Sequence, residues 1–392
     1  MELIKNTTRS SFLPYAQQDI EEQDIKAVVD VLKSDWLTTG PKIEQFEQEV
    51  ADYCHAKYAV AVATGTAALH TACFAAGIKT GDEVITSPMT FAASANCILY
   101  QGGKPVFADI DPTTYNIDPE QIERKITART KAIIPVDYTG QPAELDLIKE
   151  IAQRHQLFVI EDAAHSLGAE FKGKKVGSMA ELTTLSFHPV KHITCGEGGM
   201  VLTDNSQLYN KMKQFRTHGI IREPAESCNQ EPWLYQQHFL GYNYRLTDLQ
   251  AALGLSQLKK IDSFINRRRK IAARYNRAFS ALDLVEVPVQ LSGSNSSWHL
   301  YIIKLKLEKL KVGRKEIFNT LRQKNLGVNV HFIPVYYHPY YQRLGYKKGL
   351  CPVAEDLYER IITLPLFPKM TEHDVDYVID VVTAVLRENS LI

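Results

Sequence analysis

Residues 157–165 read LFVIEDAAH, a short apolar run that ends in two acidic residues and a histidine. Such a run is typical of a buried strand in a parallel sheet, and Asp162 would lie at its carboxyl end. Four earlier runs of this kind, each followed by a helical pattern, lie at 58–63, 83–86, 105–110 and 131–137. Strand and helix in turn predict an α/β fold: a mostly parallel central sheet with helices on both faces.

A second stretch continues this pattern. Residues 182–191 read LTTLSFHPVK, which places Lys191 shortly after another strand-like run. Ligands of such sheets bind beyond the carboxyl ends of the strands, so we expect Asp162 and Lys191 to face one crevice. There a lysine amine can bond the aldehyde of pyridoxal 5′-phosphate while a carboxylate keeps the ring nitrogen protonated. The pair therefore predicts a site for this cofactor.

Other residues at predicted strand ends fit the same cofactor. Gly65 and Thr66 stand at a strand-to-helix turn whose free amides suit a phosphate, and Ser186 adds a hydroxyl. Phe91 would stack on the pyridine ring, and His165 would orient Asp162 or cover the ring. Each residue has a structural alternative as well: a helix-capping turn, a core phenylalanine or a buried, hydrogen-bonded histidine.

Composition narrows the class of protein. The 392 residues include 45 Lys and Arg and 45 Asp and Glu, so no net charge favours nucleic acid or an anionic membrane as a partner. The six cysteines lie far apart without a CxxC pair, which argues against a metal site and fits a reducing compartment. We find no signal peptide and no apolar run long enough to span a bilayer, and predict a cytoplasmic protein.

The length predicts two domains, a large one over 1–265 with an N-terminal helical arm and a small C-terminal one over 266–392. Apolar spacing predicts one long helix over 246–280 as the link between them. In the α+β small domain we expect two strands and two helices, near 298–307, 328–333, 314–324 and 371–387.

Six motifs in the chain resemble the DegT/DnrJ/EryC1/StrS family of sugar aminotransferases. They are WLTTGPK at 36–42, DEVIT at 82–86, EDAAH at 161–165, SFHPVK at 186–191, GYNYRLTD at 241–248 and LPLF at 364–367. The resemblance implies the fold-type I fold of pyridoxal-phosphate aminotransferases, with Lys191, Asp162, Phe91, Thr66 and Ser186 around the cofactor. It also implies a homodimer with shared active sites, in which Asn243 reaches the phosphate from the partner subunit and Thr39 lies near the site across the interface.

The resemblance further implies a substrate class. Segments 188–194 (HPVKHIT), 232–237 (PWLYQQ) and 328–335 (VNVHFIPV) are similar to transaminases of pseudaminic acid biosynthesis. These take an amino group from L-glutamate and make UDP-4-amino-4,6-dideoxy-N-acetyl-β-L-altrosamine from a UDP-linked keto-sugar. The expected sugar-nucleotide contacts are His188, Arg222, Arg245, His331, Tyr337 and His338.

Three other functions stay open at this point. Cys195 within ITCGEGG also occurs in aminoarabinose transaminases of lipid A modification, another nucleotide-sugar class. Some family members dehydrate sugars, but they carry histidine in place of the lysine, whereas Lys191 is present here. A ligand sensor without catalysis would need the phosphate pocket but not both Lys191 and Asp162.

Overall fold

The computed structural model of the protein describes residues 9–221 and 233–391. Seven strands form a central sheet in the order β1-β9-β8-β5-β4-β2-β3. Their bounds are β1 Tyr58–Val62, β2 Glu83–Thr86, β3 Lys104–Phe107, β4 Thr130–Ile134, β5 Phe158–Asp162, β8 Leu182–Ser186 and β9 Gly199–Thr203. Neighbours pair in parallel except at β9, which runs antiparallel to both β1 and β8. The prediction of a mostly parallel sheet is confirmed.

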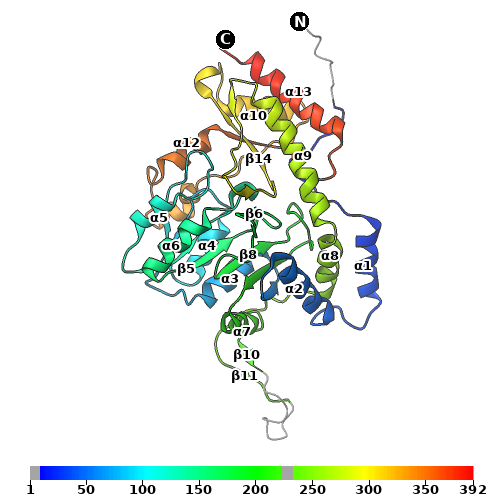
Figure 1. Cartoon of the computed structure of the whole chain (residues 1–392), viewed down its shortest axis with the longest axis vertical. Helices are drawn as coiled ribbons and strands as arrows, with labels where there is room; N and C mark the ends of the chain where they lie inside the picture. The colour runs from blue at the N-terminus through cyan, green and yellow to red at the C-terminus, as the bar shows by residue number, and fades with distance from the viewer. Residues whose placement is uncertain (1–8, 222–232, 392) are drawn as a thin grey trace.

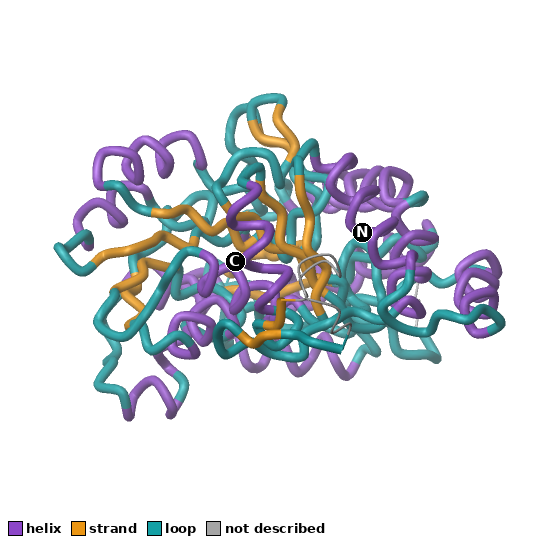
Figure 2. Tube along the Cα trace, turned by 90° about the horizontal axis from the view of Figure 1, so that it is seen from below, coloured by secondary structure: helices purple, strands orange, loops and turns teal. Residues whose placement is uncertain are grey.

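Helices cover both faces of this sheet (Figures 1 and 2). Because side chains alternate along a strand, Val60, Ala132 and Ile160 face one side, where helices α3 Gly65–Ala75, α4 Ala93–Tyr100 and α7 Ser206–Phe215 cover them. Val159 and Ile133 face the other side, against α2 Pro41–Cys54, α5 Pro119–Lys125, α6 Leu145–His155 and α8 Asp248–Leu258. The strands are therefore buried on both faces, as their nearly continuous apolar runs predict.

The carboxyl ends of β1, β5 and β8 lie at one edge of the sheet. Strands β5 and β8 are parallel neighbours with Asp162 opposite Thr184, so Asp162 and Ser186 end adjacent strands. Strand β9 starts at Gly199, where a Cβ atom would lie 2.3 Å from the Thr64 carbonyl oxygen. Only glycine allows that approach, which brings the start of β9 against the turn after β1.

The C-terminal part of the chain, from about residue 271 onwards, packs around a hydrophobic core of its own at the top of Figure 1. Strands β12 Val285–Glu286, β14 Tyr301–Leu305 and β15 Ile361–Leu364 form an antiparallel sheet, packed with α10 Arg314–Gln323 and α13 Glu372–Glu388. Helix α12 Pro352–Arg360 precedes β15 directly. The helices expected near 314–324 and 371–387 and the strand near 298–307 are confirmed.

Two predicted elements differ from the structure. The single helix over 246–280 was wrong, because α8 ends at Leu258 and α9 Ile261–Phe279 starts anew after Lys259 and Lys260. The strand near 328–333 was also wrong, because β15 takes the place beside β14. The 328–333 segment makes only an isolated bridge between Asn329 and Thr363. The division after residue 265 stays our proposal; the core of the C-terminal part takes its α9 residues from Ile271 onwards.

The N-terminal helix α1 Glu22–Leu32 is tied to α8 through one buried carboxylate. Asp24 accepts hydrogen bonds from Lys260 Nζ at 2.6 Å, Ser256 Oγ at 2.6 Å and Gln257 Nε2 at 2.9 Å. Burial raises the pKa of Asp24, but the bonds from Lys260 and Ser256 outweigh burial, so this pKa lies below its ordinary value.

Five cysteines lie in the described part, and all five are buried as free thiols: Cys54, Cys73, Cys97, Cys195 and Cys351. Burial raises the pKa of Cys54 and of Cys351 to about 12. Across residues 9–221 and 233–391, no helix is both long and apolar enough to cross a membrane.

Candidate active site

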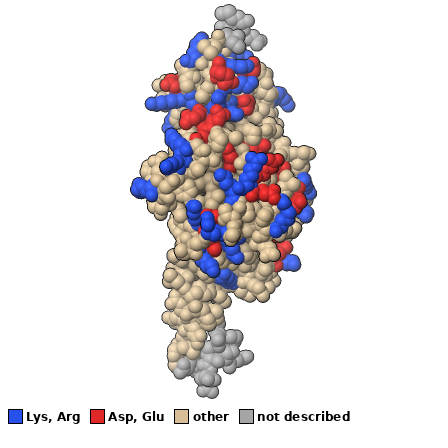
Figure 3. Space-filling model, turned by 90° about the vertical axis from the view of Figure 1, so that its left-hand side faces the viewer, with Lys and Arg blue, Asp and Glu red and all other residues tan. Residues whose placement is uncertain are grey.

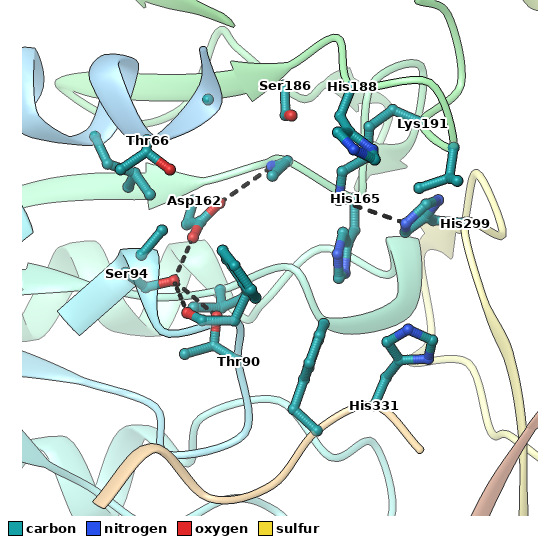
Figure 4. Close-up of a pocket in the computed structure, with 18 of the residues that line it drawn as sticks. Thr66, Thr90, Ser94, Asp162, His165, Ser186, His188, Lys191, His299 and His331 are labelled. Carbon is teal, nitrogen blue, oxygen red and sulfur yellow. Dashed lines mark hydrogen bonds between the residues drawn. The ribbon is translucent and has the colours of Figure 1, made fainter. Parts of the chain in front are cut away.

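A cavity of about 640 Å³ opens at the carboxyl edge of the sheet. Of the residues proposed from the sequence, it brings together nine: Gly65, Thr66, Phe91, Asp162, His165, Ser186, His188, Lys191 and His331. All of these except Gly65 and Phe91 are labelled in Figure 4. The turns after β1, β5 and β8 supply most of them, which is why residues far apart in sequence share one space. The C-terminal part closes the cavity with His299 and segment 329–332.

Asp162 forms the acidic side of this cavity and is only 4% exposed. Its Oδ2 accepts a hydrogen bond from Ser94 Oγ at 2.6 Å, and its Oδ1 accepts one from the Ala164 amide at 3.2 Å. Burial raises the pKa of Asp162, whereas the Ser94 hydroxyl, the Ala164 amide and the charge of Lys191 all act to lower it. The carboxylate is thus held by donors on two sides in a dry environment.

Lys191 lies across the cavity in the turn that follows β8. Desolvation lowers the pKa of Lys191 to about 8, and the charge of Asp162 opposes that shift. Its Nζ is 3.5 Å from His299 Nε2. A lysine with this pKa exists partly as the neutral amine near pH 8, the form that attacks an aldehyde and accepts a proton.

The turn from β1 into α3 has the shape of an anion site. Thr64 is the N-cap of α3, with Oγ1 accepting from the Ala67 amide at 3.0 Å, so the capping alternative holds for Thr64. Gly65 lies against Ser186, where a Cβ atom would be 2.8 Å from Ser186 Cβ. Thr66 and Ser186 therefore reach the same end of the cavity as the first amides of α3, which suits a phosphate.

Histidines and aromatic rings line the opposite wall. The His165 ring packs between Phe332 and His299, with ring centroids 5.9 Å and 4.4 Å away. Its buried Nδ1 has no hydrogen-bond partner within the described chain, and the same is true of Nδ1 of His299. Burial, joined by the charge of Lys191, holds the pKa of both imidazoles well below the ordinary range, so both are neutral. Phe91, 63% exposed, lies at the mouth of the cavity.

The tautomer of His331 follows from its neighbours. The side-chain oxygen of Asn329 accepts from the Val330 amide at 2.8 Å, so the Asn329 amide nitrogen faces His331 Nε2 at 3.3 Å. Since an amide nitrogen only donates, Nε2 accepts, and the ring proton sits on Nδ1, which donates to Thr363 Oγ1 at 3.0 Å. Burial and the charge of Lys191 lower the pKa of His331 to about 4.

Several proposed residues lie outside the cavity. Thr39 and Asn243 are exposed, and Arg245 is half-buried; none of the three lines it. Tyr337 packs against Tyr336 and Tyr358. His338 lines a second cavity of about 630 Å³, which shares Thr90, Phe91, Val330 and Phe332 with the first. Arg222 lies outside the described residues.

Sequence reasoning missed several polar residues of the site, among them Thr90, Ser94, His299 and Asn329. Ser94 stands in a helix of small and apolar residues, where a serine gives no pattern. His299 belongs to the C-terminal part, and its contact with Lys191 spans more than a hundred residues. No pattern in the sequence identifies either residue.

Comparison with known proteins identifies the family to which this chain belongs. The model of the DegT/DnrJ/EryC1/StrS aminotransferase family matches residues 18–383. The chain belongs to this family. It is 44% identical to the spore coat polysaccharide biosynthesis protein SpsC of Bacillus subtilis over 97% of this chain and 98% of SpsC. It is therefore a sugar aminotransferase of the DegT/DnrJ/EryC1/StrS type.

Solved structures of the family agree in fold and cofactor. PseC of Helicobacter pylori, an aminotransferase of pseudaminic acid biosynthesis, superposes with a TM-score of 0.90 at 33% identity, covering 96% of this chain and 100% of PseC. Spr1654 of Streptococcus pneumoniae in its PMP form gives 0.91 at 31% identity, covering 96% and 99%, and it is also solved in a PLP form. The expected fold is confirmed, and the cofactor is pyridoxal 5′-phosphate.

The residues present fit this cofactor. The cavity offers an amine of lowered pKa, a buried carboxylate on the side away from it, and an anion turn where Gly65 leaves room that a Cβ would fill. The Nδ1 of His165, which has no hydrogen-bond partner within the described chain, belongs to a residue that lines the same cavity. An amine for the aldehyde, a carboxylate that accepts from the ring nitrogen and a turn of phosphate donors are the three kinds of group that pyridoxal phosphate needs.

Proposed function

We propose that this aminotransferase moves an amino group from L-glutamate to C4 of a UDP-linked 4-keto-6-deoxy-N-acetylhexosamine. The product would be UDP-4-amino-4,6-dideoxy-N-acetyl-β-L-altrosamine. The observation that carries amino transfer is the presence of Lys191 opposite Asp162 in one cavity. The likeness to PseC supports the sugar, and the likeness to SpsC supports a sugar destined for a polysaccharide.

In this proposal each residue of the cavity has one task. Bound pyridoxal phosphate supplies an electron sink for the carbon that gains or loses the amino group. Asp162 would face the ring nitrogen, Phe91 and His165 would enclose the ring, and Thr66, Ser186 and the first amides of α3 would hold the phosphate. Asn243 of the partner subunit completes the phosphate site.

Lys191 is the proposed acid and base. A group works best in proton transfer when its pKa is near the working pH, and burial brings that of Lys191 to about 8. Its Nζ would take up or release a proton beside the reacting carbon, C4 of the sugar. The neutral imidazole of His299, 3.5 Å away, leaves that amine without a competing charge.

The sugar nucleotide is proposed to extend from the first cavity into the second. Phe91 and Phe332 line both, and Tyr100, Tyr340 and His338 line the second. Such aromatic rings offer flat apolar surface to a sugar or a uracil base. We keep Thr39, His188, Arg245, His331 and Tyr337 as further proposed contacts.

A homodimer is proposed for the working enzyme. Residues 233–244 contain no Lys, Arg, Asp or Glu, yet Trp233 is 72% and Leu240 is 77% exposed. Figure 3 shows charged side chains of both signs over the main body, whereas the described part of its lower projection bears none on this face. An exposed apolar surface of this kind is typical of a protein interface.

The cytoplasmic location stays a prediction.

The first experiment is the visible spectrum of the purified protein before and after L-glutamate. We expect a yellow band that bleaches with glutamate and returns when a UDP-linked 4-keto-6-deoxy-N-acetylhexosamine is added, with a new amino sugar found by mass spectrometry. If the band bleaches but does not return, the substrate would be another keto-sugar, such as the aminoarabinose precursor. Ammonia release without an amino sugar would indicate the dehydratase function instead.

A further inference from the structure

Ser94, which no role above uses, makes the shortest contact to Asp162. It lies in the first turn of α4 and is 1% exposed. Its Oγ is 2.6 Å from Asp162 Oδ2 and 2.7 Å from Thr90 Oγ1, so three buried oxygens form a chain of two hydrogen bonds (Figure 4). All three residues also line the cavity.

The chemistry of these groups fixes the direction of the hydrogen bonds. An ionised carboxylate accepts only, so the single proton of Ser94 Oγ points to Asp162. The Ser94 oxygen then accepts, and Thr90 Oγ1 must donate to it. If Asp162 were protonated at Oδ2, the hydrogen bonds could reverse, with Ser94 donating to Thr90 Oγ1 at the same 2.7 Å. Donation from Ser94 to the carboxylate, with Thr90 donating to Ser94, is the arrangement that stabilises the ionised form of Asp162.

We propose that Ser94 is a positioning residue that keeps Asp162 ionised and aimed into the cavity, with Thr90 polarising the Ser94 hydroxyl from behind. The proposal rests on the role proposed above for Asp162 beside the ring nitrogen, but it does not depend on which sugar is the substrate.

The surroundings of Asp162 explain why a donor is needed there. Burial favours the neutral acid, which cannot stabilise a positive ring nitrogen. Lys191 faces the carboxylate from the turn after β8 and favours its charge, whereas Glu161 on β5 and the Cys97 thiol on α4 are groups whose own ionisation would disfavour it. If a bound cofactor engages the Lys191 amine, the full charge of that lysine would not be available to Asp162. Ser94 and the Ala164 amide then remain as donors to the carboxylate.

Binding of two ligands to the apo-protein tests the proposal without turnover. Pyridoxamine 5′-phosphate carries the ring nitrogen, and its analogue with carbon at that position does not. For Ser94→Ala we expect about 10- to 100-fold weaker binding of pyridoxamine phosphate, the loss of one hydrogen bond to a charged group, with unchanged binding of the analogue. Ser94→Thr should restore the affinity, and Thr90→Val should cause a smaller loss of the same kind.

The outcomes separate the proposals. Equal losses for both ligands would show that Ser94 only supports the local packing and would overturn the inference. Asp162→Asn is the reference: it should also weaken pyridoxamine phosphate selectively. If Asp162→Asn behaves so and Ser94→Ala does not, the role of Ser94 is wrong and that of Asp162 stands. If neither is selective, the proposed role of Asp162 fails as well.

Discussion

At the scale of single residues, burial decides the chemistry of the site. The same desolvation that lowers the pKa of Lys191 raises that of Asp162, so the cavity moves both groups towards their neutral forms. For Asp162, the Ser94 hydroxyl, the Ala164 amide and the charge of Lys191 oppose this shift, although burial is the larger effect. The proposed roles call for an amine that can be neutral and an acid that is ionised, on two sides of one ring.

The pKa of Lys191 predicts how the apo-protein takes up its cofactor. Only the neutral amine attacks the aldehyde, so the rate of appearance of the cofactor's visible absorbance should rise with pH through a midpoint of about 8. Asp162→Asn should lower that midpoint, because the charge of Asp162 raises the pKa of Lys191. Stopped-flow absorbance measures both, and Lys191→Arg is the control without a reactive amine. A midpoint near the ordinary lysine value would contradict desolvation as the cause.

Gly65 predicts a second residue effect. In Gly65→Ala the new methyl group would lie 2.8 Å from Ser186 Cβ and 2.9 Å from its Oγ. The turn must then shift, which costs about 1–3 kcal/mol for such overpacking and displaces the phosphate donors. We expect a lower melting temperature and weaker cofactor binding, both measured by thermal unfolding with and without pyridoxal phosphate. Gly313→Ala is the matched control, since its methyl group would meet only the movable end of Glu316.

At the scale of elements, the attachment of α1 to α8 depends on Asp24. In Asp24→Ala, Lys260 and Gln257 lose their buried partner, so the free energy of unfolding should fall by about 3–5 kcal/mol. Because the pKa of Asp24 is lowered in the folded state, its contribution is present above the unfolded pKa of about 3.9 and is lost as pH falls through the folded pKa. Urea unfolding at neutral and acidic pH measures the difference, which should shrink on acidification.

Asp30→Ala is the control for this experiment, because Asp30 is an exposed carboxylate on the same helix. It should leave the free energy of unfolding nearly unchanged at either pH. Equal effects of the two substitutions would mean that Asp24 acts through helix propensity and not through its bonds to α8.

Most elements were predictable because burial leaves a pattern in the sequence. Strands such as β4 and β5 are covered on both faces, so they read as apolar runs, and their carboxyl ends located Asp162 without a structure. The segment 328–333 (VNVHFI) is also rich in strand-forming residues, yet it pairs only at Asn329, because the adjacent position beside β14 belongs to β15. A pattern reports which side chains are buried, not which backbone is the neighbour.

The remaining misses have the same origin. The break between α8 and α9 falls at Lys259 and Lys260, where neither glycine nor proline marks it and apolar spacing continues on both sides. Ser94 is recognised as a residue of the site only by its distance to Asp162, a contact between residues far apart in sequence. Long-range polar contacts carry no periodicity, so the sequence alone cannot reveal them.

At the scale of the whole molecule, the proposed dimer predicts complementation between inactive chains. Lys191→Ala would inactivate its own site, whereas Asn243→Ala would impair the site of the partner. A mixed dimer then has one site with both changes and one with neither, so an equal mixture should regain about a quarter of wild-type activity. Steady-state kinetics on refolded mixtures measures it, with light scattering to check for twice the 44.3 kDa chain mass. No recovery would place Asn243 in the site of its own chain.

The burial of the cysteines has a practical consequence for such work. A thiol with a pKa of about 12 is almost never a thiolate at neutral pH, so alkylating probes should react very slowly with Cys54 and Cys351. Once Cys228→Ala has removed the one cysteine outside the described residues, Asp30→Cys would offer a single fast-reacting position per subunit. With one spin label on each chain, the distance between the two labels in the assembly would report how two copies meet.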